Sequence, residues 1–225
     1  MSRRITIVGG AFGSGKTEFA LGYALKLVND QPNQKVGLVD LDIVNPYFRS
    51  RDLAEKLQPL GLDVISTALG MEHADLPALS PRIYAFLQNR AAQVVFDVGG
   101  DPAGSRALGR FEQYFDSEEY DFWLVMNPFR PDTSNIEKAT TMITALQTAS
   151  KLQATGIITN INLGLETTLS DWQLGQEFIQ KIAKTAKLPV VYDAVTKFFY
   201  QNHRDFLNNY PVFPLELQMR TPWNE

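Results

Sequence analysis

The stretch IVGGAFGSGKTEFALGYAL, residues 7–25, decides the fold of this chain. Between Gly10 and Thr17 it has the spacing G-x-x-x-x-G-K-[ST], after a β-branched run and before residues with helical apolar spacing. Glycines in that context let the backbone amides of residues 13–17 turn toward phosphate oxygens at the start of a helix. The pattern predicts a P-loop, in which Lys16 bridges the β- and γ-phosphates and the Thr17 hydroxyl binds Mg²⁺. The predicted nucleotide-binding residues of this loop are Gly10, Gly13, Ser14, Gly15, Lys16 and Thr17.

The composition of the chain favours a cytoplasmic protein. Its 225 residues are 44% hydrophobic and carry a formal net charge of −4, which argues against nucleic acid or an anionic membrane as a general partner. The absence of cysteine excludes disulfides and thiolate metal sites and fits a reducing compartment. The N-terminus lacks the apolar segment of a signal peptide, and no apolar run approaches the roughly 20 residues that span a bilayer. We therefore expect one cytoplasmic domain over residues 1–225, with no nucleic-acid or membrane partner.

Apolar runs alternate with amphipathic stretches along the chain. Continuous apolar strands separated by helices predict an α/β fold with a parallel sheet covered on both faces. In the helix that begins near residue 134, Ser134 is the expected cap, and Pro81 is expected in the first turn of another helix. Strands are predicted over residues 4–10, 35–42, 62–67, 93–100, 120–127, 154–160 and 188–195, and helices over 17–30, 80–91, 134–152 and 170–187.

The second predicted strand ends in the sequence VDLDIVNPYFRSRD, residues 39–52. Asp40 and Asp42 are two residues apart, so in extended chain both side chains point to the same face. They could order Mg²⁺ or align the attacking water; the alternative is that they cap a helix or form a turn. Arg49 and Arg51 follow, and they would reach phosphate or a partner unless they are simply solvated.

The fourth predicted strand ends in VVFDVGGDPAG, residues 94–104, which has the Walker B pattern of apolar residues before an aspartate. Asp97 would hold the Mg²⁺ shell. Gly100 stands where a D-x-x-G switch brings a backbone amide to the γ-phosphate, and Asp101 is a candidate for positioning water. Together with the P-loop, this strand end predicts a nucleoside triphosphate site.

The sixth predicted strand ends in GIITNINLG, residues 156–164. The side-chain amides of Asn160 and Asn162 can both donate and accept hydrogen bonds, as an adenine edge requires. The guanine signature N-K-x-D is absent here, which favours ATP over GTP. The alternative is that both residues are turn asparagines.

These motifs resemble the SIMIBI-class P-loop ATPases, specifically the CobQ/CobB/MinD/ParA nucleotide-binding domain family. The segments GGAFGSGKT, VDLDIVNP, FDVGGDPAG and GIITNINLG carry the resemblance, in that order. It implies a three-layer α/β/α P-loop NTPase fold with a mostly parallel sheet of seven or eight strands, ATP and Mg²⁺ as ligands, and often a nucleotide-dependent homodimer. It also implies that Asp40 is the switch I acid and that Asp97 and Gly100 belong to switch II.

One position departs from that family. Ala11 stands where many relatives carry a second lysine that reaches the nucleotide across the dimer. Charge compensation must then come from elsewhere, and Arg49 or Arg51 is the nearest candidate in the sequence, since an arginine supplied in trans stabilises transition-state charge. The C-terminal stretch 210–223 also lacks the basic amphipathic helix that anchors the membrane-binding relatives.

Two functions compete at this point. The first is a regulatory or assembly ATPase whose hydrolysis changes its shape or its protein partner. The alternative is a small-molecule kinase or ATP-dependent ligase, for which segment 66–90 would form a lid, with Glu72 and His73 lining a pocket. A binding module with an inactive site is disfavoured, because the residues needed for catalysis are all present: Lys16, Thr17, Asp40 and Asp97.

Overall fold

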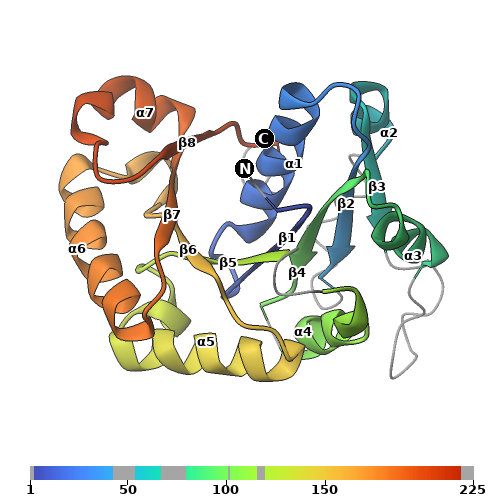
Figure 1. Ribbon diagram of the computed structural model, residues 1–225. Coiled ribbons are helices and arrows are strands. Elements are labelled where there is room, and N and C mark those ends of the chain that lie inside the picture. Colours follow the sequence, from blue (N-terminus) through green and yellow to red (C-terminus); the bar gives the residue numbers. More distant parts are fainter. Residues whose placement is uncertain (1–2, 43–53, 67–79, 101, 116–119, 219–225) are drawn as a thin grey trace.

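The computed structural model describes residues 3–42, 54–66, 80–100, 102–115 and 120–218. Eight strands of these ranges form one sheet in the order β3-β2-β4-β1-β5-β6-β7-β8, and every neighbouring pair is parallel (Figure 1). Their bounds are β1 Ile5–Gly10, β2 Val36–Leu41, β3 Leu62–Ser66, β4 Gln93–Val98, β5 Tyr120–Met126, β6 Gly156–Thr159, β7 Val190–Thr196 and β8 Val212–Leu215. The predicted parallel α/β sheet is confirmed, and its eighth strand comes from the C-terminal stretch.

Helices cover both faces of the sheet and make three layers (Figure 1). The apolar face of α1 packs on one side, in a cluster with residues of β2, β5 and β8. Buried apolar residues of α3, α4, α5 and α6 form a second cluster on the other side, and Trp172 of α6 belongs to a third cluster. The helices are α1 Lys16–Asp30, α2 Ala54–Leu57, α3 Pro81–Gln88, α4 Pro102–Gly109, α5 Ile136–Ser150, α6 Leu169–Ala186 and α7 Lys197–His203. Within the described ranges, no helix combines the length and the apolar character that crossing a membrane requires.

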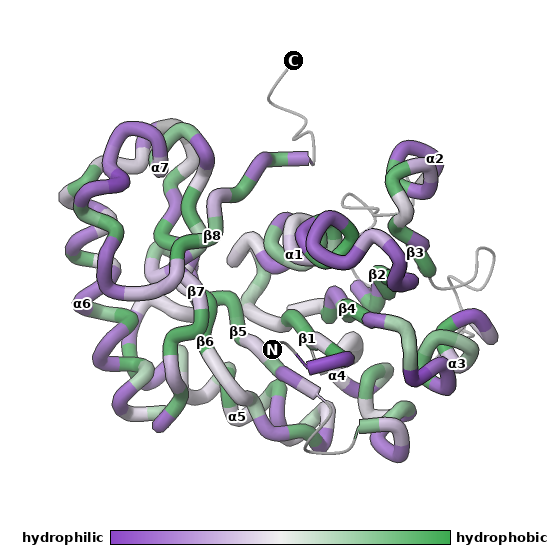
Figure 2. Tube along the Cα trace, turned by 45° about the horizontal axis from the view of Figure 1, so that its top comes forward, coloured by the Kyte–Doolittle hydropathy of each residue, from purple (hydrophilic) through white to green (hydrophobic). Residues whose placement is uncertain are grey.

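The central strands are buried along their whole length and consist mainly of apolar residues. All residues of β1, β2 and β4 are buried, and Figure 2 shows hydrophobic residues concentrated along the middle of the sheet. Burial on both faces explains why apolar residues predominate in these strands and do not alternate with exposed polar ones. Because the strands are all parallel, their carboxyl ends lie at one edge of the sheet. The residues that follow the strands therefore meet at that edge.

An aromatic cluster holds α1 against the sheet. The ring of Phe19 lies 5.0 Å from that of Phe213, and the ring of Tyr23 lies 5.0 Å from that of Trp123, both measured between centroids. Tyr192 contacts the same rings at 5.7 Å and 5.8 Å. Each such pair contributes about 0.5–1.5 kcal/mol beyond the burial of area. The first turn of α1, where the P-loop ends, is therefore anchored by strands β5, β7 and β8.

Side chains cap the helices on the other face. Ser80, the residue before Pro81, accepts a hydrogen bond from the amide of Arg82. Pro81 lies in the first turn of α3, as the sequence predicts. The cap of α5 is Asn135 and not the expected Ser134, because the Asn135 side chain accepts from the Lys138 amide at 2.8 Å. The capping residue is thus one position later than predicted.

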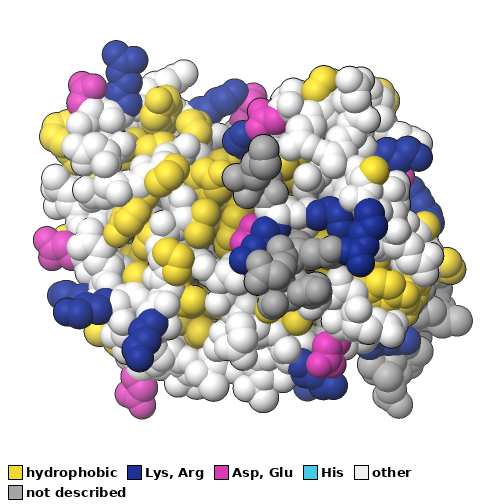
Figure 3. All heavy atoms as spheres, in the orientation of Figure 1, with side chains coloured by type: hydrophobic (Ala, Val, Ile, Leu, Met, Phe, Trp, Pro, Cys, Tyr) yellow, Lys and Arg dark blue, Asp and Glu magenta, His cyan; other side chains and the backbone are white. Residues whose placement is uncertain are grey.

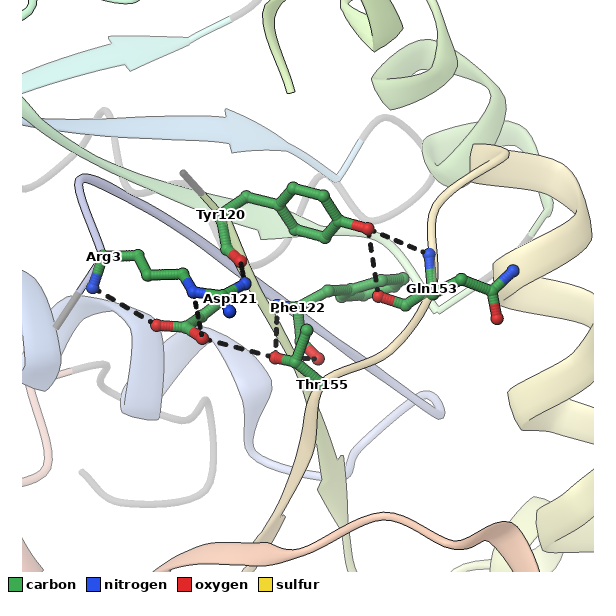
Figure 4. Close-up of polar contacts among 6 residues, drawn as sticks. All are labelled: Arg3, Tyr120, Asp121, Phe122, Gln153 and Thr155. Carbon is green, nitrogen blue, oxygen red and sulfur yellow. Dashed lines mark hydrogen bonds and ion pairs between the residues drawn. The ribbon is translucent and has the colours of Figure 1, made fainter. Parts of the chain in front are cut away.

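The amino ends of the central strands are tied together on the edge opposite the strand carboxyl ends (Figure 4). The guanidinium of Arg3 donates to the Tyr120 carbonyl oxygen at 2.6 Å, which links the chain entering β1 to the start of β5. The Tyr120 hydroxyl accepts from the Gln153 amide at 3.2 Å, and the Thr155 hydroxyl accepts from the Phe122 amide at 3.0 Å. These contacts fix the three strands at one edge and leave the other edge for the site.

Candidate nucleotide site

The predicted P-loop connects β1 to α1 as a tight turn. The Ser14 amide donates to the Ala11 carbonyl at 3.1 Å, and α1 begins at Lys16 with Gly15 as its N-cap residue. Gly15 has a φ of 89°, which favours glycine, and a Cβ added there would lie 2.1 Å from Nδ2 of Asn160. Gly13 is also left-handed, with a φ of 68°. The backbone therefore has the turn before a helix N-terminus that phosphate binding requires.

Lys16 is already engaged by a carboxylate. Its Nζ lies 3.1 Å from Oδ2 of Asp42, and the two side chains are only 6% and 7% exposed. The Asp42 amide in turn donates to Oδ1 of Asp40 at 3.0 Å. The pair Asp40 and Asp42 thus belongs to the site, but Asp42 has a contact that the sequence did not assign to it. A phosphate that binds Lys16 must compete with the Asp42 carboxylate.

Asp40 and Asp97 meet across neighbouring strands. They are register partners in the parallel pair β2–β4, so their side chains point to the same face of the sheet. Asp97 is buried, and its Oδ1 accepts no hydrogen bond. The pKa of Asp97 is raised to about 7, chiefly because burial disfavours the charged form; Lys16 opposes this shift, Asp40 adds to it, and a hydrogen bond from Thr17 opposes it.

This donor set fits a magnesium ion that arrives with a nucleotide. The carboxylates of Asp40, Asp42 and Asp97 outnumber the ammonium of Lys16, so the cluster has an excess of negative charge. Mg²⁺ is usually bound by one or two carboxylates together with substrate phosphates and water, and the Thr17 hydroxyl lies beside Asp97. Among the described residues, no group of three or more His, Cys, Asp or Glu is arranged to hold a metal by itself. The residues present thus suit a shared ion better than a protein-only cage.

Gly100 lies directly on the P-loop. A Cβ added to it would be 2.6 Å from the Gly10 carbonyl oxygen, 2.8 Å from the Phe12 amide nitrogen and 2.9 Å from the carbonyl carbon of Ala11. Only a residue without a side chain fits there, so the D-x-x-G segment packs directly on the P-loop backbone. The contact of the Gly100 amide with the γ-phosphate stays a prediction. Four groups of predicted residues lie outside the described ranges: Asp101, Arg49 with Arg51, Glu72 and His73.

The two asparagines after β6 have different roles. Asn160 is buried and donates from Nδ2 to the Ser14 carbonyl at 2.7 Å, which leaves Oδ1 without a partner. Asn160 thus braces the P-loop, and its Oδ1 has no hydrogen-bond partner among the described residues. The Oδ1 of Asn162 accepts from the Gly164 amide at 2.6 Å, so its side chain closes a turn, as the alternative interpretation stated.

The loop after β5 also belongs to the site, although the sequence analysis did not assign any residue of it. Asn127 is buried and donates from Nδ2 to the Asn162 carbonyl at 2.9 Å, and Arg130 lies against Gly13. The signal was available in part, because Asn127 directly follows an apolar strand. What the sequence does not disclose is that β5 is the neighbour of β1, which brings this loop to Gly10.

A buried carboxylate lies beside the site in β7. Asp193 accepts hydrogen bonds from the Thr159 hydroxyl, from Nε1 of Trp172 at 3.1 Å and from Nε2 of Gln176 at 2.8 Å. Its pKa is raised to about 6 because burial outweighs the opposing hydrogen bonds from Thr159 and Trp172. This network fixes the end of β6, directly before Asn160.

Comparison with known proteins gives a match only at the level of structure, since neither a protein-family model nor a curated protein matches the chain. The crystal structure of cell division protein FtsY from Thermotoga maritima has a TM-score of 0.52 and 22% identity, and the match covers 86% of this chain and 62% of that one. FtsY from Mycoplasma mycoides has a TM-score of 0.53 and 13% identity, over 84% of this chain and 58% of that one. The chain spans about three fifths of the length of these FtsY structures.

At these identities the likeness concerns the fold. It confirms the α/β P-loop NTPase fold. The narrower CobQ/CobB/MinD/ParA subfamily is not supported, because the similar structures named above are FtsY proteins.

Proposed function

We propose that this chain is a Mg²⁺-dependent ATPase that acts as a regulatory or assembly switch. The observation that carries the proposal is the meeting of the P-loop with two strand ends. Buried Lys16, the register partners Asp40 and Asp97, and Gly100 against the loop lie at one edge of the sheet. These are the parts that bind a triphosphate, share its metal ion and sense its terminal phosphate.

The choice of ATP rests on the loop after β6. The segment Asn160-Ile-Asn-Leu163 differs from the guanine signature N-K-x-D, and the unpartnered Oδ1 of Asn160 offers an acceptor to an amino group. Adenine has such an amino group on the edge that guanine presents as a carbonyl. In a competition assay we expect ATP to displace a fluorescent ATP analogue at lower concentration than GTP does. Equal displacement by GTP would refute the adenine preference.

The proposed switch is supported by contacts that the residues after two strands, β2 and β4, make with the P-loop. Gly100 touches the P-loop backbone, and Asp42 is bound to Lys16, so a bound triphosphate would contact the segments after β2 and β4 together. Loss of the γ-phosphate would release both segments, an order-to-disorder switch of a known kind. The triphosphate and diphosphate forms would then present different surfaces to a partner.

A second copy of this chain is the partner that we propose first, and an unidentified protein partner is the other candidate. Exposed apolar residues follow the carboxyl ends of β1, β5 and β6, with Phe12 66%, Phe129 37% and Leu163 41% exposed. Figure 3 shows further hydrophobic side chains between α6 and α1 on the face in view. Light scattering with ADP, and separately with a non-hydrolysable ATP analogue, tests the homodimer, and an unchanged mass in both states would exclude a nucleotide-driven dimer.

The reaction is tested by phosphate release from ATP and Mg²⁺ with the purified protein alone. We expect slow hydrolysis that metabolite mixtures do not change, and none with the Lys16→Ala variant at an unchanged circular dichroism spectrum. Transfer of the phosphate to a metabolite would instead establish the kinase alternative. Normal ATP binding and hydrolysis by Lys16→Ala would show that the P-loop is not the site.

A further inference from the structure

Arg130, in the loop after β5, lies against the P-loop. Strand β5 pairs with β1 up to Val125 opposite Gly10, so the chain that follows β5 emerges beside the loop that follows β1. A Cβ added to Gly13 would lie 3.4 Å from Nε of Arg130 and 3.5 Å from its Cζ. The guanidinium group therefore rests on the open side of Gly13, next to the amides that would hold phosphate.

The backbone of Arg130 is held on both sides. Its amide donates to the Asn127 carbonyl at 3.1 Å, and its carbonyl accepts from the Thr133 amide at 3.1 Å. Oδ1 of buried Asn127 accepts from the Phe129 amide at 3.0 Å, which closes the turn before the arginine. Pro131 follows and restricts Arg130 to the extended conformation that it adopts. The arginine thus projects from a fixed point, and little backbone freedom is lost when it binds a ligand.

The charge of Arg130 is available for a ligand. Among the residues that the structure describes, no side chain forms a hydrogen bond or an ion pair with its guanidinium, and the residue is exposed. Lys16, the other cation at this loop, is bound to Asp42 at 3.1 Å. A guanidinium offers a planar fork of donors that matches two phosphate oxygens, whereas an ammonium acts as a point charge.

We propose that Arg130 binds the terminal phosphate of the nucleotide in its own subunit and stabilises the transition state of hydrolysis. The inference rests on the proposed ATPase function and adds the residue that supplies the missing charge. Ala11 leaves no lysine at the start of the P-loop, and buried Ala11 itself brings no charge to the site. Arg130 approaches the same loop from the side, through Gly13.

Arg130 contributes charge and not a proton in this reaction. A water oxygen forms a bond to the γ-phosphorus while the bond from that phosphorus to the β–γ bridging oxygen breaks. The bridging oxygen leaves with ADP, one proton of the water stays on the inorganic phosphate, and the other goes to solvent. Negative charge grows on the bridging oxygen, where the guanidinium would donate its hydrogen bonds. An arginine supplied in cis has this role in some nucleotide switches.

The test compares Arg130→Ala and Arg130→Lys with Arg90→Ala, which removes an exposed arginine between α3 and β4 at the opposite edge of the sheet. Affinities for ATP and ADP are measured by displacement of a fluorescent analogue, and phosphate release is measured in single turnover. For Arg130→Ala we expect turnover to fall by about 10²-fold or more and ATP affinity to fall more than ADP affinity. Arg130→Lys should recover part of the affinity but little of the rate, and Arg90→Ala should match the wild type.

An experiment that mixes two inactive variants distinguishes whether Arg130 acts on the nucleotide of its own subunit or on that of a neighbouring subunit. Arg130→Ala retains the P-loop and Lys16→Ala retains Arg130, so a mixture of the two would regain turnover only if Arg130 acted on a neighbouring subunit. We expect no recovery, and recovery would overturn the assignment to the same subunit. If the wild type binds ATP and Arg130→Ala binds and hydrolyses it equally well, the role of Arg130 is refuted alone. If the wild type binds no nucleotide, the proposed function and this inference are refuted together.

Discussion

Replacement of Asp193 by asparagine is expected to change how the stability of the fold depends on pH. Burial raises the pKa of Asp193 to about 6 in the folded chain, from its ordinary value of 3.8. The protonated form is therefore favoured by folding. This contribution to stability is fully present below the pKa of the unfolded chain and is lost as the pH rises through the folded value.

The size of the effect follows from the shift. About two pH units at 1.36 kcal/mol each give roughly 3 kcal/mol between low and neutral pH. About half of this free energy is gained as the pH falls from 7.5 to 5, because the folded Asp193 takes up its proton in that range while Asp193 of the unfolded chain stays ionised. The other half is gained below pH 5. Asparagine cannot ionise, and Oε1 of Gln176, which is buried without a partner, can accept from the new amide after a rotation of the Gln176 side chain. The variant should therefore fold.

Urea unfolding monitored by far-ultraviolet circular dichroism, at several values between pH 5 and pH 7.5, measures the difference. The free energy of unfolding of the wild type should gain about 1.5 kcal/mol relative to Asp193→Asn when the pH falls over this range. Asp205→Asn serves as the control for the loss of one negative charge, since the Asp205 side chain is 91% exposed. A constant difference between wild type and Asp193→Asn, or a change in the opposite direction, would refute the reasoning.

Three further predictions concern the site itself. Gly100→Ala should reduce the affinity for ATP at least about tenfold in the displacement assay, because its Cβ would lie 2.6 Å from the Gly10 carbonyl oxygen and must push the two loops apart. Asp42→Asn should lower the thermal midpoint of the nucleotide-free protein, since it leaves Lys16 buried without its counter-charge, and should enlarge the rise of that midpoint on addition of ATP. Asp97→Asn should weaken the dependence of ATP affinity on Mg²⁺, whereas Asp40→Asn should mainly slow phosphate release, by about 10²–10⁴-fold if Asp40 positions the water.

Each of these has a result that would contradict it. Wild-type affinity in Gly100→Ala would mean that the loops separate freely. An unchanged midpoint in Asp42→Asn would mean that the ion pair contributes nothing to the folded state. Equal hydrolysis by Asp40→Asn and wild type would remove Asp40 from the mechanism, and unchanged Mg²⁺ dependence in Asp97→Asn would do the same for the metal role of Asp97.

The fold could be predicted from the sequence because the central strands are buried on both sides and are therefore mainly apolar, with the carboxylates of Asp40 and Asp97 near their carboxyl ends. Strand β8 was not predicted, because Val212–Leu215 lacks the long apolar run of a central strand. It is short, lies at the edge of the sheet and contains Pro214. A proline within a four-residue run predicts a loop. The structure tolerates Pro214 in β8 because an edge strand has one side without a partner strand.

The site could be predicted only where one segment supplies the chemistry. The P-loop glycines, Asp97 and Gly100 each carry a local pattern, and the structure brings them together. The ion pair of Lys16 with Asp42 was not predictable, because it depends on side-chain conformations across two loops. Arg130 was missed because its place beside Gly13 follows from the order of strands in the sheet, which differs from their order in the chain.

With the proposed function, the ion pair between Lys16 and Asp42 would make nucleotide binding and the position of Asp42 depend on each other. Any protein that draws Asp42 away from Lys16 would raise the affinity for nucleotide, and bound nucleotide would raise the affinity for that protein by the same factor. A protein that instead holds Asp42 on Lys16 would expel nucleotide without touching it. Exchange of nucleotide on this chain could thus be governed from a surface that makes no contact with the phosphate pocket.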